Sequence, residues 1–434
     1  MKYPRYPAYK DSKIQWIGEI PEHWMVKRLK HTAHPMFEKG NHEAEQVALE
    51  NIEGWSGKYV PTETEFAGDG IRFEIGDVLF GKLRPYLAKV YRAEFQGEAV
   101  GEFFVLRSAA NINSKFLSYW LLNEDFINVV DSSTFGAKMP RVDWIFMGNL
   151  PTAVPPESEQ RDISESLSYE ITKIDSSISK QQRLIELFKE KRQAIITHVV
   201  TKGLDPNVPM KDSGIEWIGE IPEDWEITPL KRLMTCNDEV LSENTHPDSE
   251  LKYIEISDVS DGNGITNIQE IIFSEAPSRA RRIVRDGDII ISTVRTYLRA
   301  IASVQEPEHN TVVSTGFAVL RPRKISGGFA KYALSADYFI EEVISESTGV
   351  SYPSISSEKM ITFKIAVPDK ETQFRITKSL DKTMNVLSSL ISKQEQMIEL
   401  LKEHKSSLIS NAVTGKIDVR GLVKGVTIPA GQTP

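Results

Sequence analysis

The sequence contains two nearly identical stretches of fifteen residues. Residues 10–24 read KDSKIQWIGEIPEHW, and residues 211–225 read KDSGIEWIGEIPEDW. Twelve of the fifteen positions are identical, and the second stretch follows the first at an offset of 201 residues. This period is much longer than the 20–50 residues of a solenoid repeat. It indicates a tandem duplication of a whole domain together with its connector.

The similarity continues beyond these two tags in the same order in both copies. The offset between matching segments drifts, as expected for duplicated domains with different loop insertions. The matched segments are GDVL at 76–79 with GDII at 287–290, VLR at 105–107 with VLR at 319–321, and VPPESEQ at 154–160 with VPDKETQ at 367–373. We expect the missing second proline and Glu-Gln pair of the second copy to be tolerated at a helix start.

A long segment without proline or glycine ends each copy. Its apolar residues recur at alternating steps of three and four, which is typical of a coiled-coil seam. Two such helices in one chain are predicted to pair with each other; the alternative is that each packs on its own globular domain. The seam is predicted to contain Ile174, Ile178, Gln181, Ile185 and Phe188, and Leu387, Ile391, Gln394, Ile398 and Leu401.

The two stripes are interrupted by polar residues at matching places. Gln181 matches Gln394, and Arg192 matches Lys405. Polar residues at seam positions lower stability but fix the register of a coiled coil. About 43 helical residues would form a rod of roughly 65 Å.

Between tag and helix, each copy contains short β-rich runs bounded by Gly-Asp, Gly-Asn and proline turns. Strands are expected at 77–80, 103–106, 288–292 and 317–320, and short helices near 114–123 and 331–342. The predicted fold class is α+β, with two duplicated domains joined by two long antiparallel helices in a pseudo-twofold arrangement. The predicted divisions are a first segment 1–24, a domain 25–156, a helix 157–203, a linker 204–225, a domain 226–367, a helix 368–415 and a tail 416–434.

The bulk composition indicates a folded protein of more than one domain. The chain has 434 residues, of which 40% are hydrophobic and 9% aromatic, so it is too long for one ordinary core and too apolar for general disorder. The only cysteine is Cys236, which excludes an internal disulfide and a thiolate metal cluster. No run approaches the ~20 apolar residues of a membrane span, and the first residues lack the apolar core of a signal peptide. We therefore expect a cytoplasmic protein that contacts no membrane.

The net charge of −9 by itself favours a protein or small-molecule partner over nucleic acid. The cations nevertheless cluster at matching places in the two copies. Arginine suits nucleic-acid binding because its planar fork holds a guanine edge or a phosphate. The alternative is a solvated strand face of salt-bridged arginines. The candidate DNA-binding residues here are Lys82, Arg84 and Tyr86 in the first copy, and Arg279, Arg281, Arg282, Arg295, Tyr297 and Arg299 in the second.

A second candidate is a pair of loops rich in small hydroxyl residues and glycine. Residues 132–141 read SSTFGAKMPR, and residues 347–354 read STGVSYPS. Such loops can approach a DNA groove closely, and Lys138, Arg141, Ser351 and Tyr352 would then reach base edges. They are equally well interpreted as ordinary surface turns. The tryptophans of the tags are predicted to be structural anchors rather than ligand contacts.

The sequence contains no linear catalytic signature among those searched. It lacks a phosphate-binding loop, a G-x-G-x-x-G turn, an H-E-x-x-H zinc motif and a G-x-S-x-G nucleophile elbow. The Pro155-Pro156 pair is preceded by Val154 and followed by Glu157, so it lacks the polar donor and aromatic residue of an adenine methyltransferase motif. We expect a non-catalytic protein with no metal site.

The tag W-I-G-E-I-P-E-x-W resembles the segment that opens each half of the specificity subunits of type I restriction–modification systems. The order of tag, domain, G-D-[IV]-[LI] with a following arginine, V-P, long helix and repetition is similar to that family over essentially the whole chain. The segment AVTGKID at 412–418 also looks like the family's usual ending.

This resemblance implies that each globular domain is a target recognition domain for one half of a bipartite, asymmetric site in double-stranded DNA. The paired helices would set the spacing and dock two modification (adenine methyltransferase) subunits, which recruit restriction (motor–nuclease) subunits. AdoMet, ATP and Mg²⁺ would then belong to those partners, with no cofactor bound by this chain. The alternatives are a stand-alone methyltransferase with an unrecognised motif, or a duplicated protein-binding scaffold without DNA specificity.

Overall fold

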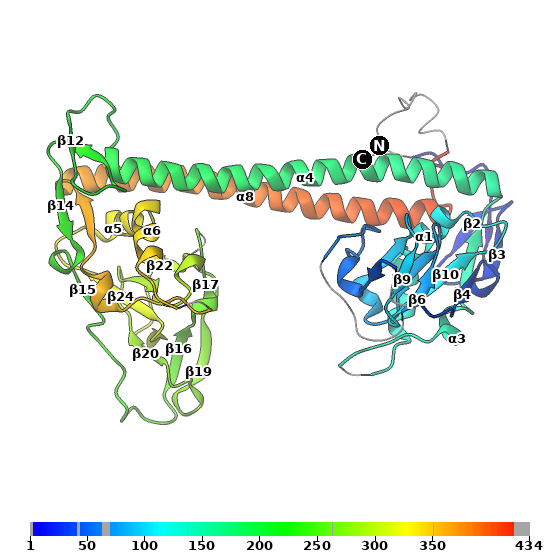
Figure 1. Cartoon of the computed structure of the whole chain (residues 1–434), viewed down its shortest axis with the longest axis horizontal. Helices are drawn as coiled ribbons and strands as arrows, with labels where there is room; N and C mark the ends of the chain where they lie inside the picture. The colour runs from blue at the N-terminus through cyan, green and yellow to red at the C-terminus, as the bar shows by residue number, and fades with distance from the viewer. Residues whose placement is uncertain are drawn as a thin grey trace. The chain divides into compact units, whose positions relative to one another are not determined.

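The computed structural model describes residues 3–40, 44–62, 70–136, 138–262, 264–349 and 351–420. The chain divides into two compact units. The first unit contains residues 1–182 and 395–434, and the second contains residues 183–394. Each unit therefore combines one globular domain with one part of both long helices (Figure 1).

The two long helices are α4 (Glu157–Lys202) and α8 (Lys370–Val413). In the first unit, Asp175 of α4 forms an ion pair with Lys405 of α8. The start of α4 lies near the end of α8, since the indole of Trp24 is hydrogen-bonded to Glu159 near the start of α4 and also lies against Gly415 just after α8. Residue numbers thus rise along α4 as they fall along α8, which confirms the predicted antiparallel pairing. In the second unit, Ile196 and Val200 share a core with Ile376 and Leu380.

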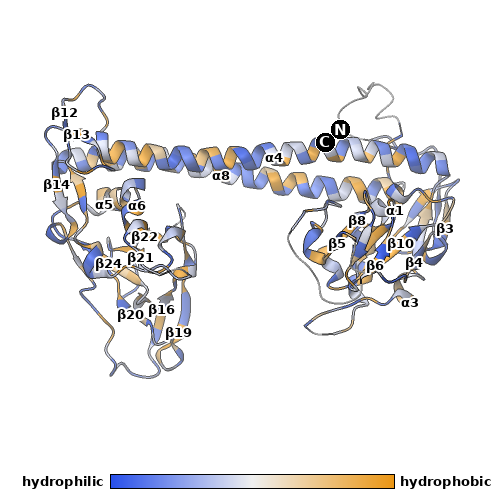
Figure 2. Ribbon diagram, viewed as in Figure 1, coloured by the Kyte–Doolittle hydropathy of each residue, from blue (hydrophilic) through white to orange (hydrophobic). Residues whose placement is uncertain are grey.

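Most predicted seam residues are covered by the partner helix or the domain beneath it. Ile174, Ile185, Leu387, Ile391 and Ile398 are buried. The other five seam residues are half-buried: Ile178, Gln181, Phe188, Gln394 and Leu401. Figure 2 shows apolar and polar residues alternating along both helices, as expected when only a narrow stripe of each helix is covered.

The two charged interruptions of the seam have different partners. Lys405 is 7% exposed, and its Nζ lies 3.0 Å from a carboxylate oxygen of Asp175 on the facing helix. Arg192 is 8% exposed and lies 3.7 Å from Asp261 in the second globular domain. A buried cation requires a nearby carboxylate because desolvation is otherwise uncompensated. These matched positions therefore serve helix–helix pairing in one copy and helix–domain packing in the other.

The described part of the first globular domain is built on two small sheets and a two-stranded ribbon. One has the strand order β4-β10-β7-β8, with bounds Ala33–Met36, Phe103–Ser108, Val78–Gly81 and Val90–Arg92. The other has the order β5-β9-β6, with bounds Gln46–Val47, Gly97–Ala99 and Ile71–Phe73. Strand β11 (Pro151–Val154) pairs with β3 (Met25–Arg28), so the two ends of the domain are joined before α4 begins.

The second domain repeats this plan, with a fourth strand in its second sheet and an additional hairpin. Its first sheet has the order β15-β24-β21-β22, with bounds Met234–Cys236, Phe317–Pro322, Ile289–Ser292 and Ile301–Ser303. Its second sheet has the order β19-β16-β23-β20, with bounds Gln269–Ile272, Glu250–Ile254, Thr311–Ser314 and Ala280–Ile283. Strands β14 (Glu226–Pro229) and β25 (Lys364–Val367) join its ends, and β17 (Val259–Ser260) and β18 (Gly264–Ile265) form a hairpin.

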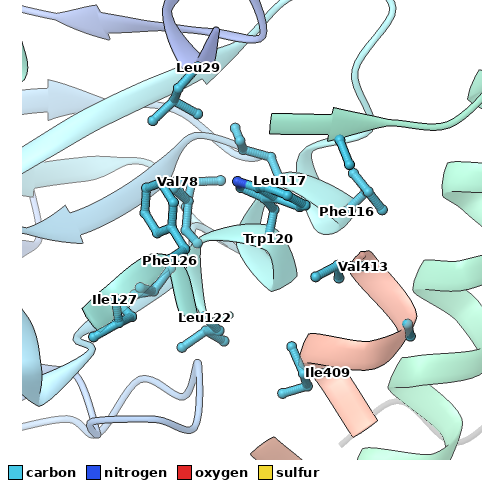
Figure 3. Close-up of a cluster of buried hydrophobic side chains, with 14 of the residues drawn as sticks. Leu29, Val78, Phe116, Leu117, Trp120, Leu122, Phe126, Ile127, Ile409 and Val413 are labelled. Carbon is cyan, nitrogen blue, oxygen red and sulfur yellow. The ribbon is translucent and has the colours of Figure 1, made fainter. Parts of the chain in front are cut away.

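Short helices fill the space between sheet and long helices. In the first domain, α1 (Ser114–Leu121) and α2 (Glu124–Ser132) begin at Asn113 and Asn123, whose side chains cap them. Figure 3 shows Trp120 and Phe126 of these helices gathered with Ile409 and Val413 of α8. The domain core is thus continuous with the apolar side of α8.

The single helix expected near 331–342 is instead two helices, α5 (Gly327–Leu334) and α6 (Asp337–Ser345). The chain turns at Ser335 and Ala336, and the N–H of Asp337 then donates to the hydroxyl of Thr197 on α4. A helix start needs partners for its free N–H groups, and here α4 supplies one. Continuous apolar periodicity concealed this break, and the helix α2 was likewise not predicted. A further four-residue helix lies in each domain, α3 (Trp144–Met147) and α7 (Ser357–Met360).

The two tags fold as small hairpins beside the ends of the long helices. They are β1 (Tyr9–Asp11) with β2 (Glu19–Pro21), and β12 (Met210–Asp212) with β13 (Glu220–Pro222). Trp24 and Trp225 are buried, whereas Trp217 is 55% exposed. Trp225 lies against Gly203 after α4, and Trp24 lies against Gly415 after α8. The first tag therefore contacts the end of α8, nearly 400 residues later in the chain. The second tag makes the equivalent contact with the end of α4, which directly precedes it.

Candidate nucleic-acid interface

One strained turn carries the matched arginines of both domains. Arg84 and Arg295 have φ values of 50° and 51°, in the left-handed region that side chains with a Cβ rarely adopt. Each precedes a 3₁₀ turn, at Pro85–Leu87 and at Thr296–Leu298. A strained backbone that occurs twice at one place is held by its surroundings, and such positions cluster at functional sites.

The surroundings are the second candidate loop. The N–H of Arg84 donates to the carbonyl of Pro140 at 2.7 Å, and the N–H of Arg295 donates to that of Pro353 at 2.7 Å. The loop itself is closed by pairing of Phe135 with Arg141 in one domain and of Thr348 with Ser354 in the other. The arginine turn and the hydroxyl-rich loop, separate candidates in the sequence, thus form one structure in each domain. We call it the turn–loop frame; its described residues are 82–88 with 134–136 and 138–142 in the first domain, and 293–299 with 347–349 and 351–355 in the second.

The frame exposes several large side chains. In the first domain Tyr86 is 45% exposed, and Met139 is 58% exposed. In the second domain Tyr297 is 52% exposed, and Tyr352 is 61% exposed. Lys138 and Ser351 are also exposed. Aromatic and aliphatic side chains that stay exposed beside arginines are suited to stacking or to apolar contact with bases.

The two frame arginines differ in their immediate contacts. The guanidinium of Arg295 lies 4.6 Å from the ring centre of Tyr352, a cation–π contact. That of Arg84 donates to the carbonyl of Lys138 at 3.4 Å. Both side chains are exposed, and within the described residues neither has an ion pair. Their charge is therefore available to a phosphate or a base.

Other candidate cations are bound within the protein. Arg141 forms two hydrogen bonds with Glu102, at 2.6 and 3.1 Å. Arg299 pairs with Asp337 at 2.8 Å and with Glu341 at 3.3 Å, so its guanidinium is directed at α6 rather than outward with Tyr297. Lys82 lies over the ring of Phe104 at 5.6 Å. These contacts are specific, so any DNA contact by these three side chains would have to compete with them.

Arg281 and Arg282 on β20, and Arg279 just before that strand, lie outside the frame. Arg279 is exposed. Arg281 lies over the ring of Phe273 at 4.9 Å. Arg282 donates to the carbonyl of Phe317, and burial lowers the pKa of its guanidinium. The basic cluster seen in the sequence is thus divided among separate environments, because adjacent strand residues point to opposite faces.

The aspartate of the matched G-D motif and the arginine of the matched V-L-R motif are hydrogen-bonded to each other in both domains. Asp77 accepts two hydrogen bonds from Arg107, at 2.8 and 2.9 Å. Asp288 accepts two from Arg321, both at 2.8 Å. Each aspartate, 2% and 0% exposed, also accepts from a backbone N–H of its own turn. These bidentate bonds to a buried aspartate explain why both motifs recur, and sequence reasoning did not connect them.

Over the described residues, no helix is both long and apolar enough to cross a bilayer. The same residues contain no cluster of three or more His, Cys, Asp or Glu side chains arranged to hold a metal ion.

Comparisons with known proteins agree on one family. The model of the type I restriction modification DNA specificity domain matches residues 222–400. The type I restriction enzyme MjaVIII specificity subunit of Methanocaldococcus jannaschii is 23% identical over 437 residues, covering 93% of this chain and 95% of the relative. The putative MjaX specificity subunit of the same organism is also 23% identical, over 93% of this chain and 96% of its own length.

A solved structure shares the fold. It comes from work on complex assembly and conformational transition of the type I R-M system. The alignment covers 91% of this chain and 98% of the solved chain, with a TM-score of 0.66 and 19% sequence identity. Residues 222–400 thus match a type I restriction modification DNA specificity domain, and over most of its length the chain is similar to specificity subunits of type I restriction enzymes.

Proposed function

We propose that each globular domain recognises one half of a bipartite, asymmetric site in double-stranded DNA. The observation that carries the proposal is the turn–loop frame, which is built twice from the same backbone hydrogen bonds and exposes an arginine with no carboxylate partner among the described residues. DNA binding needs accessible cations for phosphates and accessible polar or apolar groups for base edges. The frame offers both in each domain.

The long helices would set the distance between the two half-sites. The 46 residues of α4 correspond to a rod of roughly 69 Å at a rise of 1.5 Å per residue. Half-sites on one face of DNA lie about one helical turn, roughly 34 Å, or a multiple of it apart. A stiff helix pair with buried register-fixing residues suits this role better than a flexible linker.

The helices would also dock two modification subunits. Leu187 on α4 and Leu400 on α8 are 43% and 59% exposed, and they occupy matching positions of the duplicated helices. Leu184 and Met397 match in the same way, and Met397 is 46% exposed. Two equivalent apolar surfaces suit two identical partners. In this proposal AdoMet, ATP and Mg²⁺ are bound by the modification and restriction subunits, the chain itself is non-catalytic, and the assembly works in the cytoplasm.

The decisive experiment is adenine methylation of the host genome, mapped with and without this gene while the modification subunit is expressed. The proposal predicts that one bipartite methylated motif disappears on deletion and returns on complementation. Replacing residues 226–367 by the equivalent domain of another specificity subunit should change one half of the motif only. An unchanged methylome would instead favour the duplicated protein-binding scaffold, and a change in both halves would contradict the modular reading.

A further inference from the structure

The two turn–loop frames can be superimposed residue by residue through their hydrogen bonds. The N–H of Val142 donates to the carbonyl of Lys82, and that of Ile355 donates to that of Thr293. Gly136 and Gly349 both have positive φ, 99° and 110°. A Cβ at either glycine would lie 3.2 or 3.1 Å from the carbonyl oxygen of Met139 or Tyr352. These matches equate Met139 with Tyr352 and Lys138 with Ser351.

This internal alignment separates shared from differing side chains. Arg84 and Arg295 are shared, as are Tyr86 and Tyr297 one turn later. The exposed loop positions differ, with Lys138 and Met139 in one domain against Ser351 and Tyr352 in the other. Their backbones are nevertheless held alike. The two frames therefore share their backbone hydrogen bonds and the arginine and tyrosine of the turn, whereas the exposed loop pair differs.

A residue present in both domains does not account for a difference between two half-sites. The differing positions do, and their chemistries are unlike: a cation with a flexible thioether in one, a hydroxyl with a phenol in the other. Serine and tyrosine can each accept or donate a hydrogen bond, whereas lysine only donates. Such pairs present different hydrogen-bonding patterns to a base edge in the major groove.

The shared arginines have the properties of a sequence-independent contact. Each side chain is exposed, and each backbone N–H is bonded to the loop, so the point from which the guanidinium projects is fixed. Phosphates occur at every step of any DNA sequence, and contacts to them position a protein without selecting bases. A fixed cation in both domains suits that role.

We propose that Arg84 and Arg295 are phosphate contacts, and that the pairs Lys138–Met139 and Ser351–Tyr352 determine which bases each domain selects. This proposal rests on the proposed function, since it assigns roles within the same DNA interface. In this proposal Tyr352 also restrains the side chain of Arg295, because its ring lies against the Arg295 guanidinium.

The structure supplies matched exchanges that test the loop positions. Met139→Tyr with Lys138→Ser gives the first domain the loop pair of the second, and Tyr352→Met with Ser351→Lys does the reverse. Each exchange replaces one exposed side-chain pair and leaves unchanged the residues whose backbone hydrogen bonds join the turn to the loop. The complex of the chain with its modification subunits would be used to select binding sites from randomised duplexes. We expect the first exchange to alter base preference in one half-site and the second exchange to alter it in the other.

The control variant is Ile145→Tyr, which adds an aromatic ring at an exposed position of α3 outside the frame. It should leave both half-sites unchanged. If the loop exchanges also leave both half-sites unchanged while the complexes bind normally, the loop assignment is wrong. A lost or relaxed preference in the expected half supports it as much as a new preference does.

The arginines are tested by Arg→Lys and Arg→Gln at positions 84 and 295. A phosphate contact tolerates lysine, whereas glutamine should weaken binding to all sequences alike. Loss of one phosphate contact should also reduce the slope of log affinity against log salt by about 0.9. Selective loss of preference at one base pair, with the salt slope kept, would overturn the assignment.

The selection also distinguishes the two levels of the proposal. If the wild-type complex selects no sequence at all, the proposed function fails. If it selects a bipartite sequence that the exchanges do not alter, only the inference about the loop residues fails. Unfolding temperatures of all variants would identify any variant that fails to fold, and the Arg→Lys and Ile145→Tyr variants provide the comparison.

Discussion

Removal of the Asp175 carboxylate is predicted to destabilise the first unit strongly, whereas removal of its partner cation is not. Lys405 is 7% exposed, and its ammonium lies 3.0 Å from Asp175. In an Asp175→Ala variant this lysine would remain buried without a carboxylate. Breaking a buried pair in this way costs about 3–5 kcal/mol. Asp175 also binds Lys58 at 2.8 Å, but that side chain is 52% exposed, so this second pair adds at most about 1 kcal/mol.

The converse change removes the buried charge itself. In Lys405→Met a thioether chain of similar length fills the seam, and Asp175 keeps Lys58 as its partner, so the free energy of unfolding should change by less than about 1 kcal/mol. A 3 kcal/mol loss in a unit of this size corresponds to roughly 6–12 °C in Tm. The Asp175→Ala/Lys405→Met double variant should recover most of that loss.

Differential scanning calorimetry of the four proteins measures these shifts. The control is Lys402→Met, because Lys402 pairs with Glu399 on the same helix with side chains 56% and 67% exposed. Such an exposed pair contributes roughly 0.5 kcal/mol or less. If Asp175→Ala lowers Tm no more than Lys402→Met does, the buried pair does not stabilise the helix seam.

Two other predictions concern the helix starts and the end of the chain. Gln160 and Gln373 are buried, and their side chains make three and two hydrogen bonds, respectively, to backbone groups. Because each backbone group left without a partner costs about 1–3 kcal/mol, Gln160→Ala should lower the free energy of urea unfolding more than Gln373→Ala does. Equal losses in the two variants would contradict this prediction. A hydrogen bond from Arg420 holds the pKa of Asp418 below its usual 3.8, so its stabilising effect should be complete above that value and lost as the pH falls through the lowered pKa. Cleavage of the C-terminal segment by an acid-active protease should therefore accelerate as the pH falls. An Asp418→Asn variant should lack this pH dependence. If both proteins respond to acid in the same way, the assignment to Asp418 is wrong.

Local patterns in the sequence were sufficient to predict the duplicated architecture. The repeated tag, the three-four spacing of apolar residues and the matched polar interruptions predicted two domains and a helix pair, and the pairing is confirmed. These features depend on periodicity, which is a property of neighbouring residues along the chain. The strands around 78–81, 103–108, 289–292 and 317–322 were anticipated for the same reason.

The break between α5 and α6 was not predictable from that pattern. It depends on Thr197, which lies 140 residues before Asp337 in the chain and supplies the hydrogen bond at the helix start. Likewise the link between Asp77 and Arg107 joins two motifs that looked independent. Both are pairings of residues distant in sequence, and one sequence alone contains no signal that states which distant groups meet.

The candidate site shows the same division. The sequence identified the arginines and the loops as residue types suited to DNA, because charge, hydroxyl groups and glycine can be read from the chain itself. The folded chain joins Arg84 to Pro140, binds Arg141 and Arg299 to carboxylates, and places Arg295 over Tyr352, and none of these contacts could be read from the sequence. Side-chain availability depends on what the fold brings within hydrogen-bonding distance. It is therefore a property of the folded chain rather than of the residue.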